Sequence, residues 1–201
     1  MPTSPADPLR MPAEWAEHEL TLIAWPQREE AWRDTTIEAA RDTHAAVIAA
    51  VSEFETVLVI ADPSQADDAR KRCPQSNVEV LPLPIDDSWL RDSGPIIVTG
   101  EDGDRAGVDF AFNAWGEAFS PYRNDAAISS RILDHLDIER FIEPMILEGG
   151  SIAVDGEGLL VTTEQCLLNP NRNPDLDRHT IDAELCRALG VERVVWLEKG
   201  L

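Results

Sequence analysis

Residues 86–95, written DDSWLRDSGP, bring carboxylates, a guanidinium and an indole together beside a turn. Carboxylates with a flat aromatic ring suit a planar cation, because the acids accept its N–H groups while the indole covers its face. The three carboxylates, Asp86, Asp87 and Asp92, and the indole of Trp89 therefore make this stretch a candidate site for such a cation. The plain alternative is a solvated acidic turn whose tryptophan is buried in a core.

Composition limits the class of protein. With 201 residues, 43% of them hydrophobic, the chain is long enough for one substantial core. It contains neither a run of about 18 apolar residues nor a leader pattern, which predicts a soluble, cytoplasmic protein. The unpaired spacing of Cys73, Cys166 and Cys186 suits a reducing cytoplasm and gives no metal signature.

The net charge of −21, from 38 acidic and 17 basic residues, argues against nucleic acid or an anionic membrane as partner. It permits a cationic ligand. The acidity is spread along the chain, however, which favours a surface adapted for solubility, including in high salt.

The first half of the chain alternates predicted strands and helices, which is an α/β pattern. Thr35 and Glu38 match a capping box at the start of the first helix, and His44 lies on its apolar face as a core histidine. The acidic stretch follows the third strand, where α/β folds place ligands. The predicted strands are residues 20–25, 56–61 and 78–83, and the helices are residues 36–51 and 64–72.

The second half predicts two hairpins, each followed by a helix and a strand. Pro144 indicates an edge or a bulge in the strand that delivers Glu148 onto Gly149 and Gly150. Gly190 caps the last helix. The hairpins are 95–98 with 108–112, joined by the turn 100–103, and 151–154 with 159–162; the helices are 124–136 and 180–189, the strands 141–147 and 193–197, and 169–174 is a loop.

Domain organisation is predicted to be simple. No linker divides the chain, so we expect a single domain over residues 1–201, with residues 1–13 as a flexible lead-in. The end of the sequence so soon after a buried strand suggests a truncated domain.

Several segments, in order and in register, resemble the agmatine deiminase family, which includes the Porphyromonas-type peptidyl-arginine deiminases. The resemblance covers nearly the whole chain from Met11 onward. The segments are MPAEW (11–15), AWP (24–26), DDSWLRDSGP (86–95), FNAWG (112–116), LEGGSI (147–152) and TTEQCLLNPNRNP (162–174).

The resemblance implies a pentein fold, an α/β-propeller of five ββαβ-type blades around a central site. It implies hydrolysis of agmatine to N-carbamoylputrescine and ammonia, in putrescine and polyamine biosynthesis, through a cysteine-thiouronium intermediate and without a cofactor. Asp92 matches the carboxylate that binds the guanidinium, and Trp89 matches the pocket tryptophan. Glu148 matches the acid that supports the catalytic histidine and the substrate.

Other site residues follow from the same match. Arg91 is expected to offset neighbouring acids as a structural partner, and Gly149 and Gly150 to let the backbone pass close to Glu148 or the ligand. Without the resemblance, the two glycines would be an ordinary turn.

Asn113 and Trp115, in the FNAWG segment, are further substrate-binding candidates. Their match is shorter, because Glu117 and Ala118 stand where the family usually has a glycine and a lysine.

The catalytic His-x-Asp and the nucleophilic cysteine of the family lie in a C-terminal part that this sequence does not match. His135-Leu136-Asp137 has the same spelling at a helix end, and we interpret it as coincidence. The three cysteines are interpreted as structural thiols. The chain is thus expected to lack the C-terminal blades and to be inactive alone.

Other functions stay open. The chain could be a non-catalytic guanidine- or amine-binding module, or a peptidyl-arginine deiminase. A metal-dependent hydrolase using Asp86, Asp87 and Asp92 around a hard cation is the alternative from another class. An incomplete propeller would expose sheet edges, so we expect a second copy or a complementing C-terminal fragment as partner.

Overall fold

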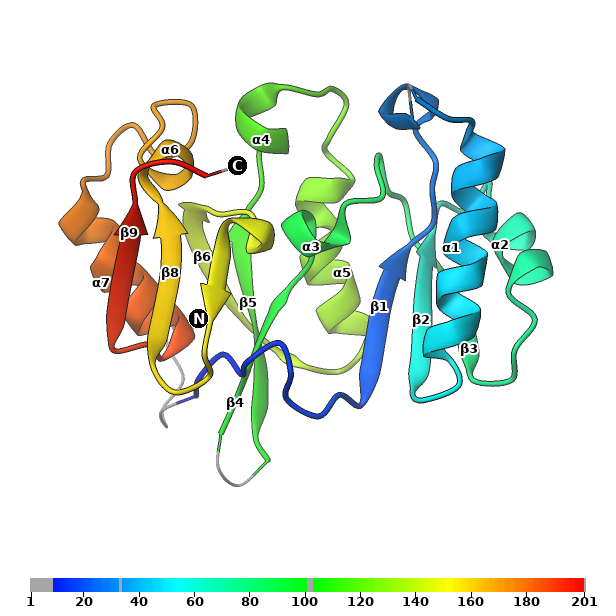
Figure 1. The fold of residues 1–201 in the computed structure, drawn as a ribbon, viewed down its shortest axis with the longest axis horizontal. Coiled ribbons are helices and arrows are strands. Elements are labelled where there is room, and N and C mark those ends of the chain that lie inside the picture. The colour runs from blue at the N-terminus through cyan, green and yellow to red at the C-terminus, as the bar shows by residue number, and fades with distance from the viewer. Residues whose placement is uncertain (1–8, 33, 101–102, 201) are drawn as a thin grey trace. The chain divides into compact units, whose positions relative to one another are not determined.

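A computed structural model describes residues 9–32, 34–100 and 103–200 (Figure 1). Helices and strands alternate along it, which confirms the α/β class, and its strands form three-stranded sheets. Contacts divide the chain into two compact units without a single linker between them, and the single truncated domain stays a prediction. Unit 1 comprises the described residues up to Ala16, Arg91–Ser120 and those from Ser129 onward; unit 2 comprises Glu17–Leu90 and Pro121–Ile128.

Unit 2 is built on a parallel sheet with the strand order β1-β2-β3. Its central strand is buried from Val57 to Ala61, as the continuous apolar run TVLVIA predicts. Helices make the two parallel crossovers. The elements are β1 (Leu20–Ala24), η1 (Glu29–Trp32), α1 (Ile37–Val51), β2 (Thr56–Ala61), α2 (Ala66–Arg72), β3 (Val78–Pro82) and η2 (Asp125–Ala127).

The start of α1 corrects the predicted capping box by one residue. Thr36, with an extended backbone, is the N-cap, and its hydroxyl accepts the N–H of Ala39 at 3.1 Å. The predicted cap Thr35 was wrong, because two adjacent threonines compete for this position. His44 is half-buried, with its ring edge-on to Trp32 at 5.5 Å.

Unit 1 contains two copies of the same arrangement, a hairpin followed by a helix and a parallel strand. The sheet orders are β4-β5-β6 and β7-β8-β9, each with one antiparallel and one parallel pair. Both predicted hairpins are confirmed, although part of the turn 100–103 lies outside the described residues. The elements are β4 (Ile96–Thr99), β5 (Arg105–Ala111), α5 (Ile128–His135), β6 (Glu139–Ile146), β7 (Ile152–Val154), β8 (Leu159–Thr163), α7 (Arg178–Leu189) and β9 (Arg193–Leu197).

One apolar core joins these two sheets inside unit 1. Val98 and Val108 of the first sheet, Leu160 of the second and Leu185 of α7 are all buried in it. Short helices at the strand ends carry polar side chains, and they are α3 (Leu90–Ser93), α4 (Ala114–Glu117), η3 (Gly149–Ser151) and α6 (Glu164–Leu167).

The described part of the predicted lead-in is packed. Leu9 and Met11 are buried in the core of unit 1, and the backbone of Arg10 pairs with Thr99. The prediction of a loose segment is therefore wrong for residues 9–13, because two apolar side chains suffice to anchor it; residues 1–8 lie outside the described residues.

The proline in β6 behaves as predicted. β6 is an edge strand of its sheet, and its register against β5 shifts so that Phe110 pairs with Glu143 while Ala111 pairs with Ile146. Pro144 lies in this irregularity, where no ladder hydrogen bond is required of it. The strand then leads directly to Glu148.

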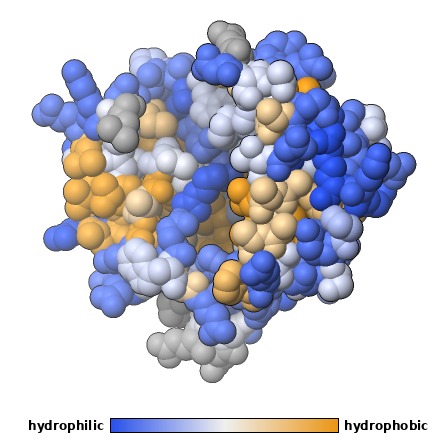
Figure 2. Space-filling model, turned by 45° about the vertical axis from the view of Figure 1, so that its right-hand side comes forward, coloured by the Kyte–Doolittle hydropathy of each residue, from blue (hydrophilic) through white to orange (hydrophobic). Residues whose placement is uncertain are grey.

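Hydrophilic residues dominate the face shown in Figure 2, with apolar patches among them, as the strongly acidic composition leads us to expect. Among the described helices, none has both the length and the apolar character needed to cross a membrane.

Candidate active site

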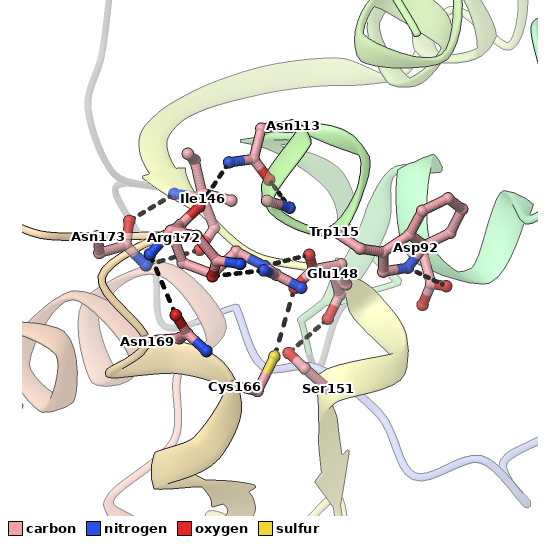
Figure 3. Close-up of polar contacts among 12 residues, drawn as sticks. Asp92, Asn113, Trp115, Ile146, Glu148, Ser151, Cys166, Asn169, Arg172 and Asn173 are labelled. Atoms are coloured by element: carbon pink, nitrogen blue, oxygen red, sulfur yellow. Dashed lines mark hydrogen bonds and ion pairs between the residues drawn. The ribbon is translucent and has the colours of Figure 1, made fainter. Parts of the chain in front are cut away.

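Asp92, the central acid of the predicted site, lies in α3 of unit 1. Its Oδ2 accepts the indole N–H of Trp115 at 3.1 Å (Figure 3). Its Oδ1 accepts the backbone N–H of Gly150 at 3.1 Å. Burial raises the pKa of Asp92, an effect opposed by these two N–H donors and increased by the negative charge of Glu148. The carboxylate is thus held in place by directed donors in a low-dielectric setting.

Glu148 is a second, more deeply buried acid at the end of β6, with 2% of its surface exposed. Its Oε1 accepts from Arg172 Nε at 2.6 Å, and its Oε2 lies 3.5 Å from the thiol of Cys166 (Figure 3). A buried carboxylate needs such a partner, because an unpaired charge would be costly. The sequence indicated Glu148 but missed Arg172.

The two glycines after Glu148 allow a close approach to α3. A Cβ on Gly149 would lie 2.3 Å from the carbonyl oxygen of Arg91, and one on Gly150 would lie 2.3 Å from Asp92 Oδ1. Any side chain at either position would therefore push the two segments apart. The sequence predicted a close passage to Glu148 or the ligand, whereas the neighbours that the structure shows are Arg91 and Asp92.

Trp115 reaches Asp92 from an unusual turn. Ala114, Trp115, Gly116 and Glu117 all have positive φ angles, between 52° and 81°. Each non-glycine residue in the left-handed region costs about 1 kcal/mol, so the turn is strained by a few kcal/mol. Asn113 begins the turn by accepting the N–H of Gly116 at 2.9 Å.

The loop predicted at residues 169–174 is confirmed. It is hydrogen-bonded to the end of β6 and to the turn that begins at Asn113. Asn173 accepts from the N–H of Ile146 and donates to its carbonyl, both at 2.9 Å. The side chain of Asn113 donates to the carbonyl of Asn171 at 2.9 Å. The TTEQCLLNPNRNP segment contains Arg172, but only the fold shows that this arginine pairs with Glu148.

Comparison with known proteins assigns the family. The family model described as Porphyromonas-type peptidyl-arginine deiminase matches residues 10–201. The chain belongs to this family.

Curated relatives of this deiminase-family chain include agmatine deiminases of Pseudomonas aeruginosa (strain LESB58) and Ectopseudomonas mendocina. They are 44% and 43% identical over 204 aligned positions, covering 99% of the chain and 55% of each relative. The chain thus spans about half the length of the curated relatives it matches.

Solved structures agree with this assignment. The agmatine deiminase of Enterococcus faecalis has a TM-score of 0.94 and 34% identity, covering 99% of the chain and 56% of that structure. A C. jejuni agmatine deiminase variant with substrate bound has a TM-score of 0.85 and 33% identity, covering 96% and 57%.

In this member of the family, Asp86 and Asp125 hold each other's segments within unit 2. The two oxygens of Asp86 accept from the backbone and side chain of Asn124 at 2.7 and 3.0 Å. Asp125 accepts the N–H groups of Asp86 and Asp87 at 2.7 and 3.2 Å. Both oxygens of Asp86 thus join two segments of the chain, and its role as a substrate ligand stays a prediction.

Trp89 also belongs to unit 2, and its exposure decides between two interpretations. Its side chain is 47% exposed and stacks on Trp32, with ring centroids 6.1 Å apart and an interplanar angle of 19°. The alternative of a tryptophan buried in a core is therefore wrong. Its role as the pocket tryptophan of the family stays a prediction.

Arg91 forms an ion pair with Glu14, which lies in the MPAEW segment. Its positive charge also lowers the pKa of Asp92, although less than burial raises it. The predicted structural role of Arg91, as an offset to neighbouring acids, agrees with this geometry.

In the three cysteines of this family member, burial favours the thiol over the thiolate. Burial and the Glu148 carboxylate raise the pKa of Cys166 to about 11. Burial also raises the pKa of Cys73, at the end of α2, and of Cys186, in α7. Since the thiolate is the nucleophile, this supports their interpretation as structural thiols.

The described residues give no support to a metal-dependent mechanism. Across the described ranges, no group of three or more histidine, cysteine, aspartate or glutamate side chains is placed to hold a metal ion. Asp87, one of the proposed ligands, is buried with Arg28 Nε 3.5 Å from its Oδ2. His135, of the His-x-Asp spelling, is the last residue of α5.

Proposed function

We propose that the chain carries the guanidinium-binding part of an agmatine deiminase. The main observation in support is the geometry of Asp92. One of its oxygens accepts the N–H of Trp115 and the other accepts the N–H of Gly150. Each carboxylate oxygen has two lone-pair directions, so one acceptor site per oxygen remains for a bidentate contact with a guanidinium. The relatives' names, the family match and the nearby Glu148 support this assignment.

The proposed reaction converts agmatine and water into N-carbamoylputrescine and ammonia. A cysteine thiolate adds to the guanidinium carbon, ammonia departs, and water cleaves the resulting thiouronium carbon–sulfur bond. Glu148 would support the catalytic histidine and the substrate, while Asp92 fixes the guanidinium carbon for attack. The nucleophile would be none of Cys73, Cys166 and Cys186, so residues 1–201 alone are expected to show negligible turnover.

The finer predictions on fold and setting belong to the same proposal. The two ββαβ arrangements of unit 1 support a pentein α/β-propeller, to which further blades would contribute the catalytic histidine and cysteine. The names of the relatives support an enzyme of putrescine biosynthesis that works without a cofactor, and the unpaired spacing of the three cysteines supports a cytoplasmic setting. A second copy or a complementing C-terminal fragment would then close the sheet edges.

Calorimetric titration with agmatine tests the binding role of Asp92. We expect binding by the wild-type chain and a loss of at least about tenfold in affinity for Asp92→Asn, since one charge-assisted contact is worth about 1.5–3 kcal/mol. The matched control is Asp109→Asn, because Asp109 of β5 is also an acid whose pKa burial raises and which pairs with Arg140 at 3.5 Å. Equal losses for both variants would contradict the proposal.

Peptidyl-arginine is the second candidate substrate, because the matching family is described by that activity. Titration with an arginine-containing peptide blocked at both ends distinguishes the two. Tighter binding of the peptide than of agmatine would move the assignment to a peptidyl-arginine deiminase. Binding of agmatine by a longer protein that carries these residues, without ammonia release, would instead indicate a non-catalytic binding module.

A further inference from the structure

Contacts in unit 1 close a ring through the two acids of the site, and we call it the contact ring: Asp92, Trp115, Arg172, Glu148 and Gly150. Asp92 accepts the N–H groups of Trp115 and Gly150, both at 3.1 Å. Gly150 follows Glu148 by two positions, and Glu148 accepts from Arg172 Nε at 2.6 Å. Figure 3 shows the four side chains of the ring, which come from different parts of the chain. The remaining link runs from Arg172 to the turn that carries Trp115.

That link consists of Asn171 and the left-handed turn. Arg172 Nη1 donates to the side-chain oxygen of Asn171 at 2.7 Å, and the carbonyl of Asn171 accepts from Asn113 at 2.9 Å. A Cβ on Gly116 would lie 2.4 Å from Cγ of Asn171 and 2.6 Å from Nη1 of Arg172. The turn therefore rests directly against both side chains, without room for even a methyl group.

The turn needs such support, because its conformation is unfavourable in isolation. Ala114, Trp115 and Glu117 have positive φ angles of 52°, 59° and 62°. Residues held in this region persist where the surroundings over-determine them. Releasing one of the surrounding contacts should let the turn relax, and the indole of Trp115 would then leave Asp92.

We propose that Arg172 is the positioning residue of the site. It binds Glu148 through Nε and Asn171 through Nη1, and in this way holds the turn so that the N–H of Trp115 meets Asp92. A planar guanidinium can span two acceptors in fixed directions, which an ammonium cannot. The inference deepens the proposed function, since it takes Asp92 and Glu148 as the guanidinium-binding acids.

The charged and titratable groups around the contact ring suggest a competing role for Arg172. Glu148 faces Arg172 and the thiol of Cys166, while the charge of Asp92 is influenced by Glu148 and Arg91. In that competing role, Arg172 would only neutralise the charge of the buried Glu148. Arg187 has that role for Glu143, which is buried on β6, without a contact to the turn among the described contacts of either residue.

Solvent exchange of the indole N–H of Trp115, measured by NMR, shows whether the contact ring is intact. The variant Trp115→Phe assigns the resonance of this N–H. In Arg172→Gln we expect this N–H to exchange with solvent at least about tenfold faster, well below the unfolding temperature. Arg172→Lys keeps the positive charge but cannot bind two acceptors in fixed directions. Compared with Arg172→Gln, we therefore expect it to restore more of the stability than of the protection of the indole N–H against exchange. Arg187→Gln, the matched control, should lose stability while indole exchange stays within about twofold of the wild type.

Indole exchange in Arg172→Gln that equals the wild type would overturn the inference, as would equal acceleration in Arg187→Gln. Agmatine addition tests the proposed function separately. If agmatine fails to bind the wild type, the proposed function fails, while the exchange result still decides the role of Arg172. If agmatine binds, we expect affinity about tenfold weaker in Arg172→Gln and within about twofold of the wild type in Arg187→Gln.

Discussion

The two units each gather acids near the end of a strand, but they use them differently. In unit 2, Asp86 and Asp125 accept mainly backbone N–H groups from each other's segments. In unit 1, Asp92 accepts an indole N–H and a glycine N–H, and Glu148 binds an arginine side chain. The first arrangement fastens two pieces of chain together. The second holds two charges in place at glycine-rich backbone.

The difference shows that clustering of acids does not by itself indicate a site. An acid whose oxygens satisfy N-terminal N–H groups replaces a helix cap, and its value is stability. An acid that is held by directed side-chain donors, beside another charge and a strained turn, has instead the perturbed setting that is typical of functional sites. Variants that separate stability from binding can therefore test the contrast.

The largest effect is expected at Glu148. Glu148→Gln leaves the guanidinium of Arg172, only 10% exposed, without its carboxylate, and should lower the free energy of unfolding by about 3 kcal/mol. Glu143→Gln is the control, because its partner Arg187 is 38% exposed and also pairs with Glu184. We expect about 1 kcal/mol there. Urea unfolding at neutral pH measures both, and equal losses would contradict the distinction.

A somewhat smaller effect is expected at Asp86. Asp86→Ala removes the acceptor for the N–H of Asn124 at 2.7 Å and for its side-chain amide at 3.0 Å, which should cost about 2 kcal/mol. Agmatine affinity should stay within about twofold of the wild type, measured by calorimetry. A loss of binding as large as that of Asp92→Asn would restore Asp86 as a ligand.

Asp125 gives the comparison a pH dependence. Burial raises its pKa from 3.8 to about 6, with Asp86 and Asp87 adding repulsion. Between these values the folded chain keeps a proton that the unfolded chain has lost, so the contribution of Asp125 to unfolding free energy falls as pH rises.

Asp125→Asn keeps an oxygen for the same N–H groups but cannot ionise. We expect it to be more stable than the wild type by about 2 kcal/mol near pH 7.5, with the difference vanishing below about pH 4. Urea titrations at both pH values measure this. A stability difference that does not change with pH would show that the charge of Asp125 carries no cost.

Local patterns in the sequence predicted most of the helices and strands, while the site they indicated stays a prediction. Apolar runs indicated β2 and the other strands, and Pro144 indicated the irregular edge. The acids of the stretch 86–95 divide between two uses, because partners distant in sequence decide which oxygens are occupied. Asn124 and Arg172 are such partners, and their signal lies in spacing that only the fold defines.

The left-handed turn could not be predicted, since Ala114 and Trp115 have no preference for positive φ. It is nevertheless the feature that most clearly separates unit 1 from unit 2 in strain. Within the turn, Glu117 stands where the family usually has glycine, at a φ of 62°. Glu117, which differs from the usual family residue, therefore lies at a position where a Cβ is unfavourable.

Glu117→Gly should therefore be more stable than Glu117→Ala by about 1 kcal/mol, because both lose the carboxylate but glycine alone adopts positive φ without strain. Thermal unfolding of the two variants measures this smallest effect. If the strain of the turn serves the site, Glu117→Gly should also keep the slow indole exchange of Trp115, since the turn then needs less support. Lower stability of the glycine variant would mean that the turn is not strained at Glu117.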